Sequence, residues 1–206
     1  MTEESPPGKV PDEDLIGRSI SGDNQAYQLL IERYQEMVNA LVWRLVPDQA
    51  DREEVCQDVF TRVYFKLNTF RFDSKFSTWL YTIAYRTAIS SLRRKKLDTV
   101  SEDIGEEDER SSLFDSIQAN SHGEHDEVEY RGISWEDVQQ EISKLDIDER
   151  TAIVLFYING CSIEEIAKIT ERPDGTVKNQ LFRVRRKLKQ RLARLLRTNN
   201  SSGHIG

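Results

Sequence analysis

This chain has few of the residues on which metal sites and disulfides depend. Of its 206 residues only two are cysteine and three are histidine. Cys56 and Cys161 lie far apart, each within an apolar helical pattern, which favours buried free thiols over a disulfide or a metal pair. His122 and His125 lie in an acidic, polar segment without a nearby cysteine, so we expect them to face solvent rather than zinc. The sequence predicts no metal site and no cofactor.

Catalytic motifs are also missing. We find no nucleophile and base at a productive spacing and no glycine-rich loop that would cradle a phosphate, because Gly175-Thr-Val lacks the rest of a P-loop. We therefore expect that this protein is not an enzyme.

Long apolar runs are absent as well. No stretch is long enough to span a bilayer, so we predict no membrane insertion. Residues 1–11 are polar, with Glu3, Glu4 and prolines, unlike a signal peptide. We expect a disordered segment over residues 1–11 and a cytoplasmic protein.

The alternation of apolar and polar residues that is typical of strands is lacking, whereas helix-forming residues dominate. These features predict an all-α fold. The length allows one or two domains, and the charged fraction of 32% with a modest apolar content favours small helical domains over one large core.

Charge is unevenly distributed along the chain, whose net charge is −7. Acidic residues concentrate between Asp98 and Glu129, where Arg110 is the only cation, while cations gather at 86–96 and 178–197. We predict a flexible acidic linker over residues 97–132 that joins two helical domains, residues 12–96 and 133–197.

The N-terminal domain should contain four helices. We expect helices over 14–20, from about 26 to the residues before Pro47, over 49–68 and over 77–96. In the third helix the outward positions form an acidic and polar face: Glu53, Glu54, Gln57, Asp58 and Thr61. Such a face taken alone indicates only contact with solvent.

Aromatic residues precede a run of cations in the fourth helix. The aromatics are Phe70, Phe72, Phe76, Trp79, Tyr81 and Tyr85, and the cations are Arg86, Arg93, Arg94, Lys95 and Lys96. Rings that stack on bases beside cations that hold phosphates suit single-stranded DNA. Helical spacing also predicts that roughly half of the six rings are core. Phe72 and Phe76 lie in the expected loop and are the better candidates for base contact.

The sequence of the C-terminal domain predicts a helix-turn-helix. Helices over 135–145 and 148–157 precede Gly160, a residue suited to end a helix. Ser162 and Glu165 have the spacing of a capping box, and the segment 171–175 contains a proline and a glycine that predict a turn. A helix with apolar positions from Val177 to Leu195 then carries cations on its other face. Residues 198–206 show no evident structure.

The second of these helices has the composition of a DNA-recognition helix, with an apolar seam and a cationic face. Two other interpretations stay open at this point. The segment could be a basic amphipathic helix on any protein surface, or it could belong to a stand-alone helix-turn-helix regulator that binds duplex operators. The second interpretation leaves the aromatic and basic N-terminal helix unexplained.

The order of these motifs resembles the extracytoplasmic-function sigma factors, the small promoter-specificity subunits of bacterial RNA polymerase. The segment 50–60 is similar to the family's helix that binds the core polymerase, 72–84 to its promoter-melting and −10 region, and 162–188 to its −35 helix-turn-helix. The resemblance covers residues 12–196. It implies promoter recognition and transcription initiation in response to an envelope or environmental stress.

The resemblance also implies roles for individual residues. Residues that would meet a coiled coil on the largest polymerase subunit are Glu53, Glu54, Gln57, Asp58 and Thr61. Residues that would bind melted −10 DNA are Phe72, Ser74, Lys75, Phe76, Trp79, Tyr85, Arg86, Arg93 and Arg94. Residues that would contact the −35 duplex are Thr176, Lys178, Asn179, Gln180, Phe182, Arg183 and Arg186. An anti-sigma factor is implied as a further partner, and the free chain is expected to be a monomer.

Four positions depart from the family pattern. The family often has Asn where this chain has Arg86, and often Ser-Arg where it has Asn179-Gln180. Asp146 replaces a usual proline before the helix predicted at 148–157. The promoter preference of this chain is therefore not expected to match that of its relatives.

Overall fold

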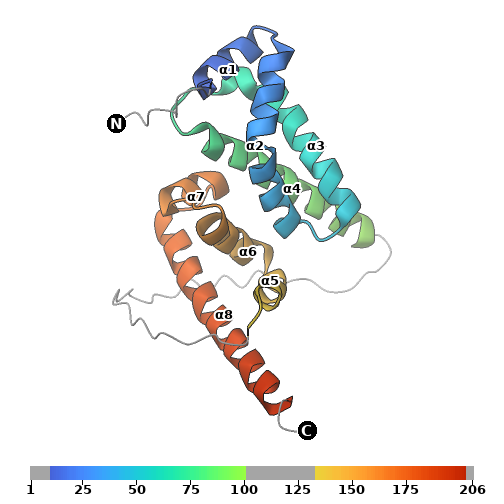
Figure 1. Ribbon diagram of the computed structural model, residues 1–206, viewed down its shortest axis with the longest axis vertical. Helices are drawn as coiled ribbons and strands as arrows, with labels where there is room; N and C mark the ends of the chain where they lie inside the picture. Colours follow the sequence, from blue (N-terminus) through green and yellow to red (C-terminus); the bar gives the residue numbers. More distant parts are fainter. Residues whose placement is uncertain (1–9, 101–132, 203–206) are drawn as a thin grey trace.

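The structure is a computed structural model that describes residues 10–100 and 133–202. Within these ranges every regular element is a helix and no strand occurs, which confirms the all-α prediction. Figure 1 shows the chain as two helical bodies, with α1 to α4 in one and α5 to α8 in the other. Most of the predicted linker and most of the N-terminal segment predicted to be disordered lie outside the described residues.

The N-terminal body is built from four α-helices and a short 3₁₀ turn. They are α1 (Asp12–Ile20), α2 (Asn24–Leu45), α3 (Gln49–Lys66), η1 (Leu67–Thr69) and α4 (Phe76–Val100). The side chain of Asp23 accepts hydrogen bonds from the amides of Gln25 and Ala26, which start α2. Asp48 accepts from the amide of Asp51 in the same way and starts α3. These caps satisfy amides that a helix leaves unpaired at its N-terminus.

The core of this body lies where α2, α3 and α4 pack together. Its fully buried side chains include Val38, Leu41, Leu45, Val59 and Leu80. Each such side chain contributes about 1.5–3 kcal/mol by leaving water. The buried positions recur at helical spacing along α2 and α3, so the opposite faces of these helices are left for polar residues.

An aromatic cluster closes the end of this core beside the loop before α4. Phe76 is only 6% exposed and meets Tyr34, Phe70 and Trp79 with ring centroids 5.1, 5.5 and 5.6 Å away. The prediction that Phe76 is a loop residue available to a base is therefore wrong in this structure, because Phe76 begins α4 and faces the core. Half of the six rings are buried, as predicted: Phe70, Phe76 and Tyr81.

The C-terminal body is smaller. It contains α5 (Trp135–Ser143), α6 (Ile147–Ile153), the π-helical turn η2 (Val154–Ile158), α7 (Ile163–Thr170) and α8 (Asp174–Ser202). The predicted capping box is present, since Ser162 accepts from the amide of Glu165 and Glu165 accepts from the amide of Ser162. Gly160 adopts φ of +66°, which suits the predicted helix end. Val154, Leu155 and Ile166 are buried in the core of this body.

The start of α6 shows why a proline is not needed there. Asp146 has extended backbone angles and its carboxylate accepts from the amide of Glu149 at 2.8 Å, so Asp146 is the N-cap. Arg150 in the next turn donates to the carbonyl groups of Ser143 and Leu145 and fixes the end of α5 against α6.

Two helices extend further than the sequence predicts. The helix expected to stop at Lys96 continues to Val100, and α8 continues to Ser202, where we expected a tail without structure. Figure 1 shows the end of α8 projecting away from both bodies. Adding residues to an existing helix costs much less than nucleating one, so a polar sequence can continue a helix that has already formed.

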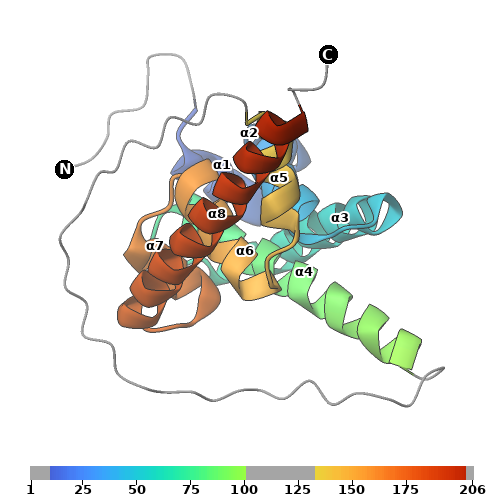
Figure 2. The same cartoon turned by 90° about the horizontal axis from the view of Figure 1, so that it is seen from below.

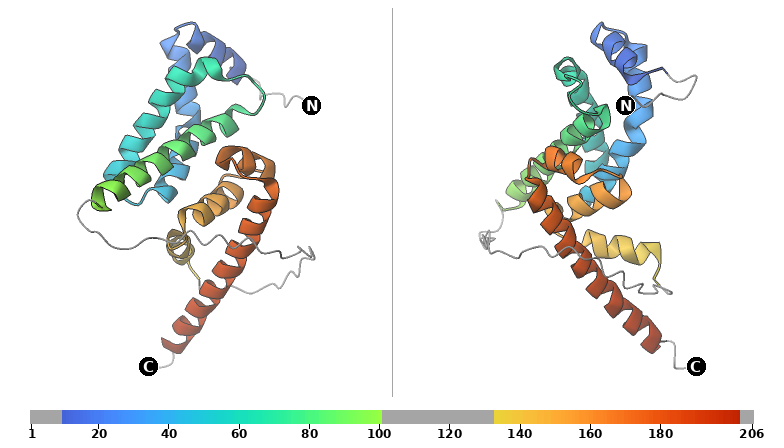
Figure 3. Two further views of the ribbon diagram at one scale, coloured as in Figure 1. Left: turned by 180° about the vertical axis from the view of Figure 1, so that it is seen from behind. Right: turned by 90° about the vertical axis from the view of Figure 1, so that its left-hand side faces the viewer.

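The two bodies are in contact. Figures 2 and 3 show α7 beside α4. Two pairs of helices make the contact, since α4 packs against α7 and α2 packs against α6. The amide of Asn159 donates to the hydroxyl of Tyr81 at 2.6 Å across this contact. Burial raises the pKa of Tyr81 above its usual value, so this hydroxyl stays protonated.

We predict that Asp146→Ala destabilises the C-terminal body by about 1 kcal/mol, because the amide of Glu149 in the first turn of α6 loses its cap. Asp146→Asn keeps an equivalent acceptor and should be close to wild type. The free energy of unfolding in urea, followed by circular dichroism, distinguishes the two variants. Equal stabilities for Ala and Asn would contradict the capping role.

We predict that Phe76→Ala lowers the free energy of unfolding by about 3–5 kcal/mol, since it removes a buried ring from a packed cluster. Phe72→Ala is the matched control: its ring is 53% exposed, so the loss should stay below about 1 kcal/mol. Thermal melting of both variants tests this. A Phe76→Ala protein as stable as Phe72→Ala would place Phe76 outside the core.

Candidate functional site

The acidic face predicted on α3 is presented to solvent. Glu53, Glu54, Gln57 and Thr61 are exposed, while Asp58 is half-buried and lies 3.8 Å from Arg62. Val55, Val59 and Val63 on the opposite side of the helix are buried and seat it on the core. The helix therefore displays carboxylates on a rigid support, which suits docking to a basic partner surface.

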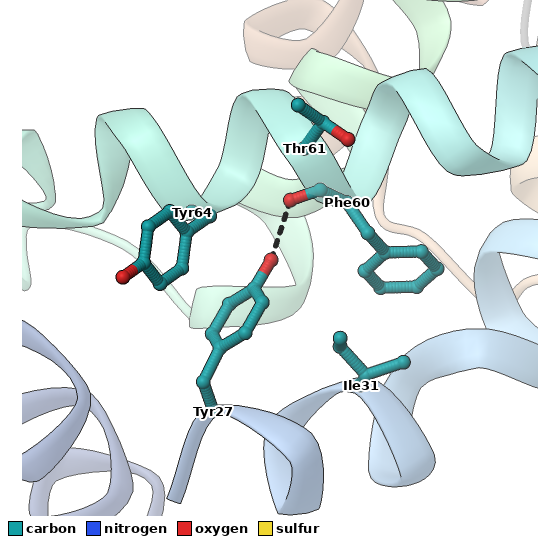
Figure 4. Close-up of a pocket in the computed structure, with 5 residues that line it drawn as sticks. All are labelled: Tyr27, Ile31, Phe60, Thr61 and Tyr64. Atoms are coloured by element: carbon teal, nitrogen blue, oxygen red, sulfur yellow. Dashed lines mark hydrogen bonds between the residues drawn. The ribbon is translucent and has the colours of Figure 1, made fainter. Parts of the chain in front are cut away.

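A shallow depression lies beside this face, between α2 and α3 (Figure 4). It has a volume of 270 Å³ and is lined by Tyr27, Ile31, Phe60, Thr61 and Tyr64. The hydroxyl of Tyr27 donates to the backbone carbonyl of Phe60, and burial raises the pKa of Tyr27 above its usual value. Sequence reasoning missed this surface because two of its five lining residues come from α2 and three from α3. Thr61 joins it to the acidic face.

The loop before α4 exposes one aromatic side chain. Phe72 is 53% exposed, has φ of +59° and lies against Phe70 with ring centroids 4.7 Å apart. A bulky residue in the left-handed region stores strain and needs its neighbours to hold it, a feature that concentrates at binding sites. The structure thus supports Phe72 as the ring available to a base.

The remaining residues predicted to bind −10 DNA fall into two groups. Ser74, Trp79 and Tyr85 are half-buried, and burial raises the pKa of Tyr85. Lys75, Arg86, Arg93 and Arg94 are exposed along the loop and α4. Lys75 forms an ion pair with Glu165 of α7, and Arg86 forms one with Glu171 at the C-cap of the same helix. The structure therefore places a strip of exposed cations that begins in the loop of Phe72 and continues along α4.

The face of α8 that the sequence predicts to recognise DNA is exposed at all but one of its positions. The exposed residues are Thr176, Lys178, Asn179, Phe182, Arg183 and Arg186. Val177, Leu181 and Val184 are buried between them and seat α8 on the rest of the body. This geometry presents polar and cationic side chains as a helix in a major groove requires.

Gln180 is the one residue of this predicted set that is buried and not on the exposed face. Its side chain is only 7% exposed, and its carbonyl oxygen accepts from the guanidinium of Arg172 at 3.3 Å. Arg172 also forms an ion pair with Asp148 of α6. Gln180 thus fixes the start of α8 to α6 and does not face a groove. The signal was available in the sequence, because Gln180 is three residues after Val177 and four before Val184.

Other kinds of site are not evident in the part of the chain that the structure describes. No cluster of His, Cys, Asp and Glu there could hold a metal ion, and none of the described helices could cross a membrane. Both cysteines are free thiols, as predicted. Burial raises the pKa of Cys161 to about 12 and also raises that of Cys56, so neither thiol is activated as a nucleophile.

Comparison with known proteins assigns the two bodies to established domains. Residues 30–97 match the family described as Sigma-70 region 2, and residues 135–188 match Sigma-70, region 4. The RNA polymerase sigma-H factor of Pseudomonas aeruginosa is 35% identical and covers 90% of this chain and 96% of its own length. The ECF RNA polymerase sigma-E factor of Escherichia coli is 36% identical over 92% of this chain and 98% of its own.

A solved structure shares the fold. The sigma factor RpoE of Bartonella quintana, determined in complex with the anti-sigma factor NepR, matches with a TM-score of 0.60 and 24% identity over 82% of this chain and 96% of its own. Both helical bodies, both domain matches and two relatives of nearly full length agree. The chain belongs to the extracytoplasmic-function family of sigma factors, which direct RNA polymerase to promoters.

Proposed function

We propose that this chain docks on a coiled coil of the largest polymerase subunit through the acidic face of α3. The exposed carboxylates of Glu53 and Glu54, with Gln57, Asp58 and Thr61 along the same face, support this. Charge complementarity would speed association and fix the register of docking. The depression lined by Tyr27 and Tyr64 lies next to that acidic face and is mostly apolar. The two surfaces together suit a partner helix that carries both cations and apolar residues.

The proposed site for the melted −10 strand is the strip formed by the loop 71–75 and α4. The single observation that supports it best is the exposed ring of Phe72 in the same loop as the exposed Lys75, followed on α4 by the exposed Arg86. An extruded base loses stacking worth a few kcal/mol, and an aromatic partner offsets that loss. Arg93 and Arg94 continue the strip toward the end of α4 and would hold phosphates. Phe76 would support this site from the core, since it packs beneath the loop.

The proposed −35 site is the exposed face of α8. Thr176 lies in the first turn, where helix amides attract a phosphate. The amide of Asn179 can form paired hydrogen bonds with an adenine edge, and Lys178 and Arg183 lie beside it. Phe182 is 60% exposed on the same face and can contact a thymine methyl.

We propose the remaining partners from what the family implies. The Bartonella relative was solved with an anti-sigma factor, and we propose an inhibitor of the same kind here. The free chain would be a monomer and would act in the bacterial cytoplasm, where the polymerase is. A stand-alone operator-binding regulator is not favoured, because that function would not explain the region 2 match or the cationic strip on α4.

Docking is tested by reversing charge on α3. The double variant Glu54→Lys, Asp58→Lys should lose core binding by at least ten-fold in a fluorescence titration with core polymerase, since two attractive contacts become repulsive. The variant Glu13→Lys, Glu136→Lys makes the same change in net charge on exposed positions of α1 and α5 and should bind normally. Unchanged affinity of the α3 variant, with its circular dichroism intact, would place docking elsewhere.

Promoter recognition is tested by transcription with core polymerase on a pool of genomic fragments, followed by sequencing of the RNA starts. Wild type should select a common −35 element, and Asn179→Ala should weaken selection at one base pair of it by roughly 1–3 kcal/mol. Gln190→Ala, an exposed amide further along α8, is the matched control. No initiation by wild type would contradict the proposal, and an unaltered element with Asn179→Ala would remove that contact from it.

A further inference from the structure

The helix α8 continues well beyond the part of it that the proposed −35 site uses. That site takes residues 176–186, and the match to Sigma-70, region 4 ends at residue 188, whereas α8 runs to Ser202. Figure 3 shows α8 as one continuous helix whose end projects beyond α5. Residues 175–206 contain no Asp or Glu, so every charged side chain of this extension, residues 189–202, is a cation.

Contacts with α5 determine which side of the extension faces solvent. The helix α8 packs against α5, and Leu188, Leu192 and Leu195 are half-buried on one side of it. Arg191 on the same side lies 3.7 Å from the carboxylate of Glu141 in α5, whose side chain is only 6% exposed. This pair crosses the interface of the two helices and fixes the rotation of α8 about its axis. The opposite side of the extension is therefore presented to solvent in one orientation.

The exposed cations of the extension continue the rows of the proposed −35 face. An α-helix has about 3.6 residues per turn, so positions eleven or eighteen residues apart lie almost in line along it. Three exposed side chains of the extension stand in line with three of the −35 face at these spacings: Lys189 with Lys178, Arg194 with Arg183, and Arg197 with Asn179. The extension therefore directs its cations to the same side as the residues that would enter the groove.

The length of α8 places these cations outside that groove. At about 1.5 Å per residue, Asn179 and Arg197 are about 27 Å apart along the helix axis. The major groove is about 12 Å wide, so a straight helix with Asn179 among the bases must leave the groove before Arg197. The groove is bordered by the sugar-phosphate backbone. A cation that leaves the groove on the side facing DNA therefore meets phosphates rather than base edges.

We propose that Lys189, Arg194 and Arg197 form a second DNA-binding surface, which binds backbone phosphates of the duplex that flanks the −35 element. The inference rests on the proposed function, because it takes the first turns of α8 as the −35 site. The second surface accepts any flanking sequence, since phosphate contacts carry no base information. It adds affinity and fixes the register of α8 on the duplex, while base selection stays with Asn179 and its neighbours.

The test variant is Arg194→Gln, Arg197→Gln, because these two cations lie furthest from the −35 site. Both side chains are exposed and glutamine is a good helix former, so α8 should remain helical, which circular dichroism checks. Arg18→Gln, Lys66→Gln is the matched control, since it removes the same charge from exposed positions on α1 and α3.

Each protein is assembled with core polymerase, and fluorescence anisotropy measures binding to a labelled duplex that carries a promoter selected by wild type. The test variant should bind about three- to thirty-fold more weakly than the control at low salt. Its plot of log affinity against log salt should be shallower by about 1.8, because each lost phosphate contact removes roughly 0.9 for duplex DNA. The −35 element found by sequencing RNA starts should be unaltered, in contrast to Asn179→Ala.

Neutral phosphates locate the contact on the DNA. Duplexes with a single methylphosphonate linkage are prepared at successive positions on both sides of the −35 element. At one or two of these positions the neutral linkage should weaken binding of the control and leave the already weakened binding of the test variant unchanged. Equal losses for both proteins at every position would contradict a contact between the extension and the backbone.

The remaining outcomes separate this inference from the proposed function. Equal affinities and salt slopes for the test variant and the control, with an altered −35 element for Asn179→Ala, would overturn the inference alone. Weaker binding of the test variant to core polymerase without DNA would assign the cations to an acidic protein surface and would also overturn it. If wild type selects no −35 element, the proposed function fails and the inference fails with it.

Discussion

The packing of α4 is the constraint on which the rest of this molecule depends. One side of α4 is buried against α2 and α3, which fixes the loop that carries Phe72. Another side lies against α7, which joins the two domains. Leu80 and Ala84 belong to the N-terminal core, while Tyr81 between them bonds to Asn159 of the other domain. A single helix thus positions both the proposed strand-binding strip and the contact with the other domain.

Electrostatics organises the surface that this packing leaves exposed. The chain is acidic overall, with a net charge of −7, yet its cations line α4 and α8. Carboxylates gather on α3, where Asp51 pairs with Lys95 of α4 while Glu53 and Glu54 face solvent. Charges attract or repel one another at distances up to about 8 Å in physiological salt, so each face favours a partner surface of opposite charge. The same attraction makes α7, with Glu165 and Glu171, complementary to the α4 strip.

Much of the local structure follows from short-range rules. Ser162 and Glu165 form the predicted capping box, Gly160 ends its helix, and the valines of α3 face inward as their spacing requires. Phe76 and Gln180, which were predicted to contact DNA, are instead buried, and the reason is the same for both. The sequence shows that an aromatic ring or an amide can bind DNA, but burial depends on neighbours such as Tyr34 and Arg172, which come from other helices.

The sequence by itself determined the helical class, the division into two domains, the acidic face of α3 and the cationic face of α8. These depend on periodicity and charge within single helices, which the chain carries locally. Only the tertiary structure decided that Lys75 and Arg86 meet Glu165 and Glu171, because partners separated by more than eighty residues are brought together by packing of whole helices. Likewise, only the fold made the depression beside Thr61, since α2 and α3 each contribute part of its lining.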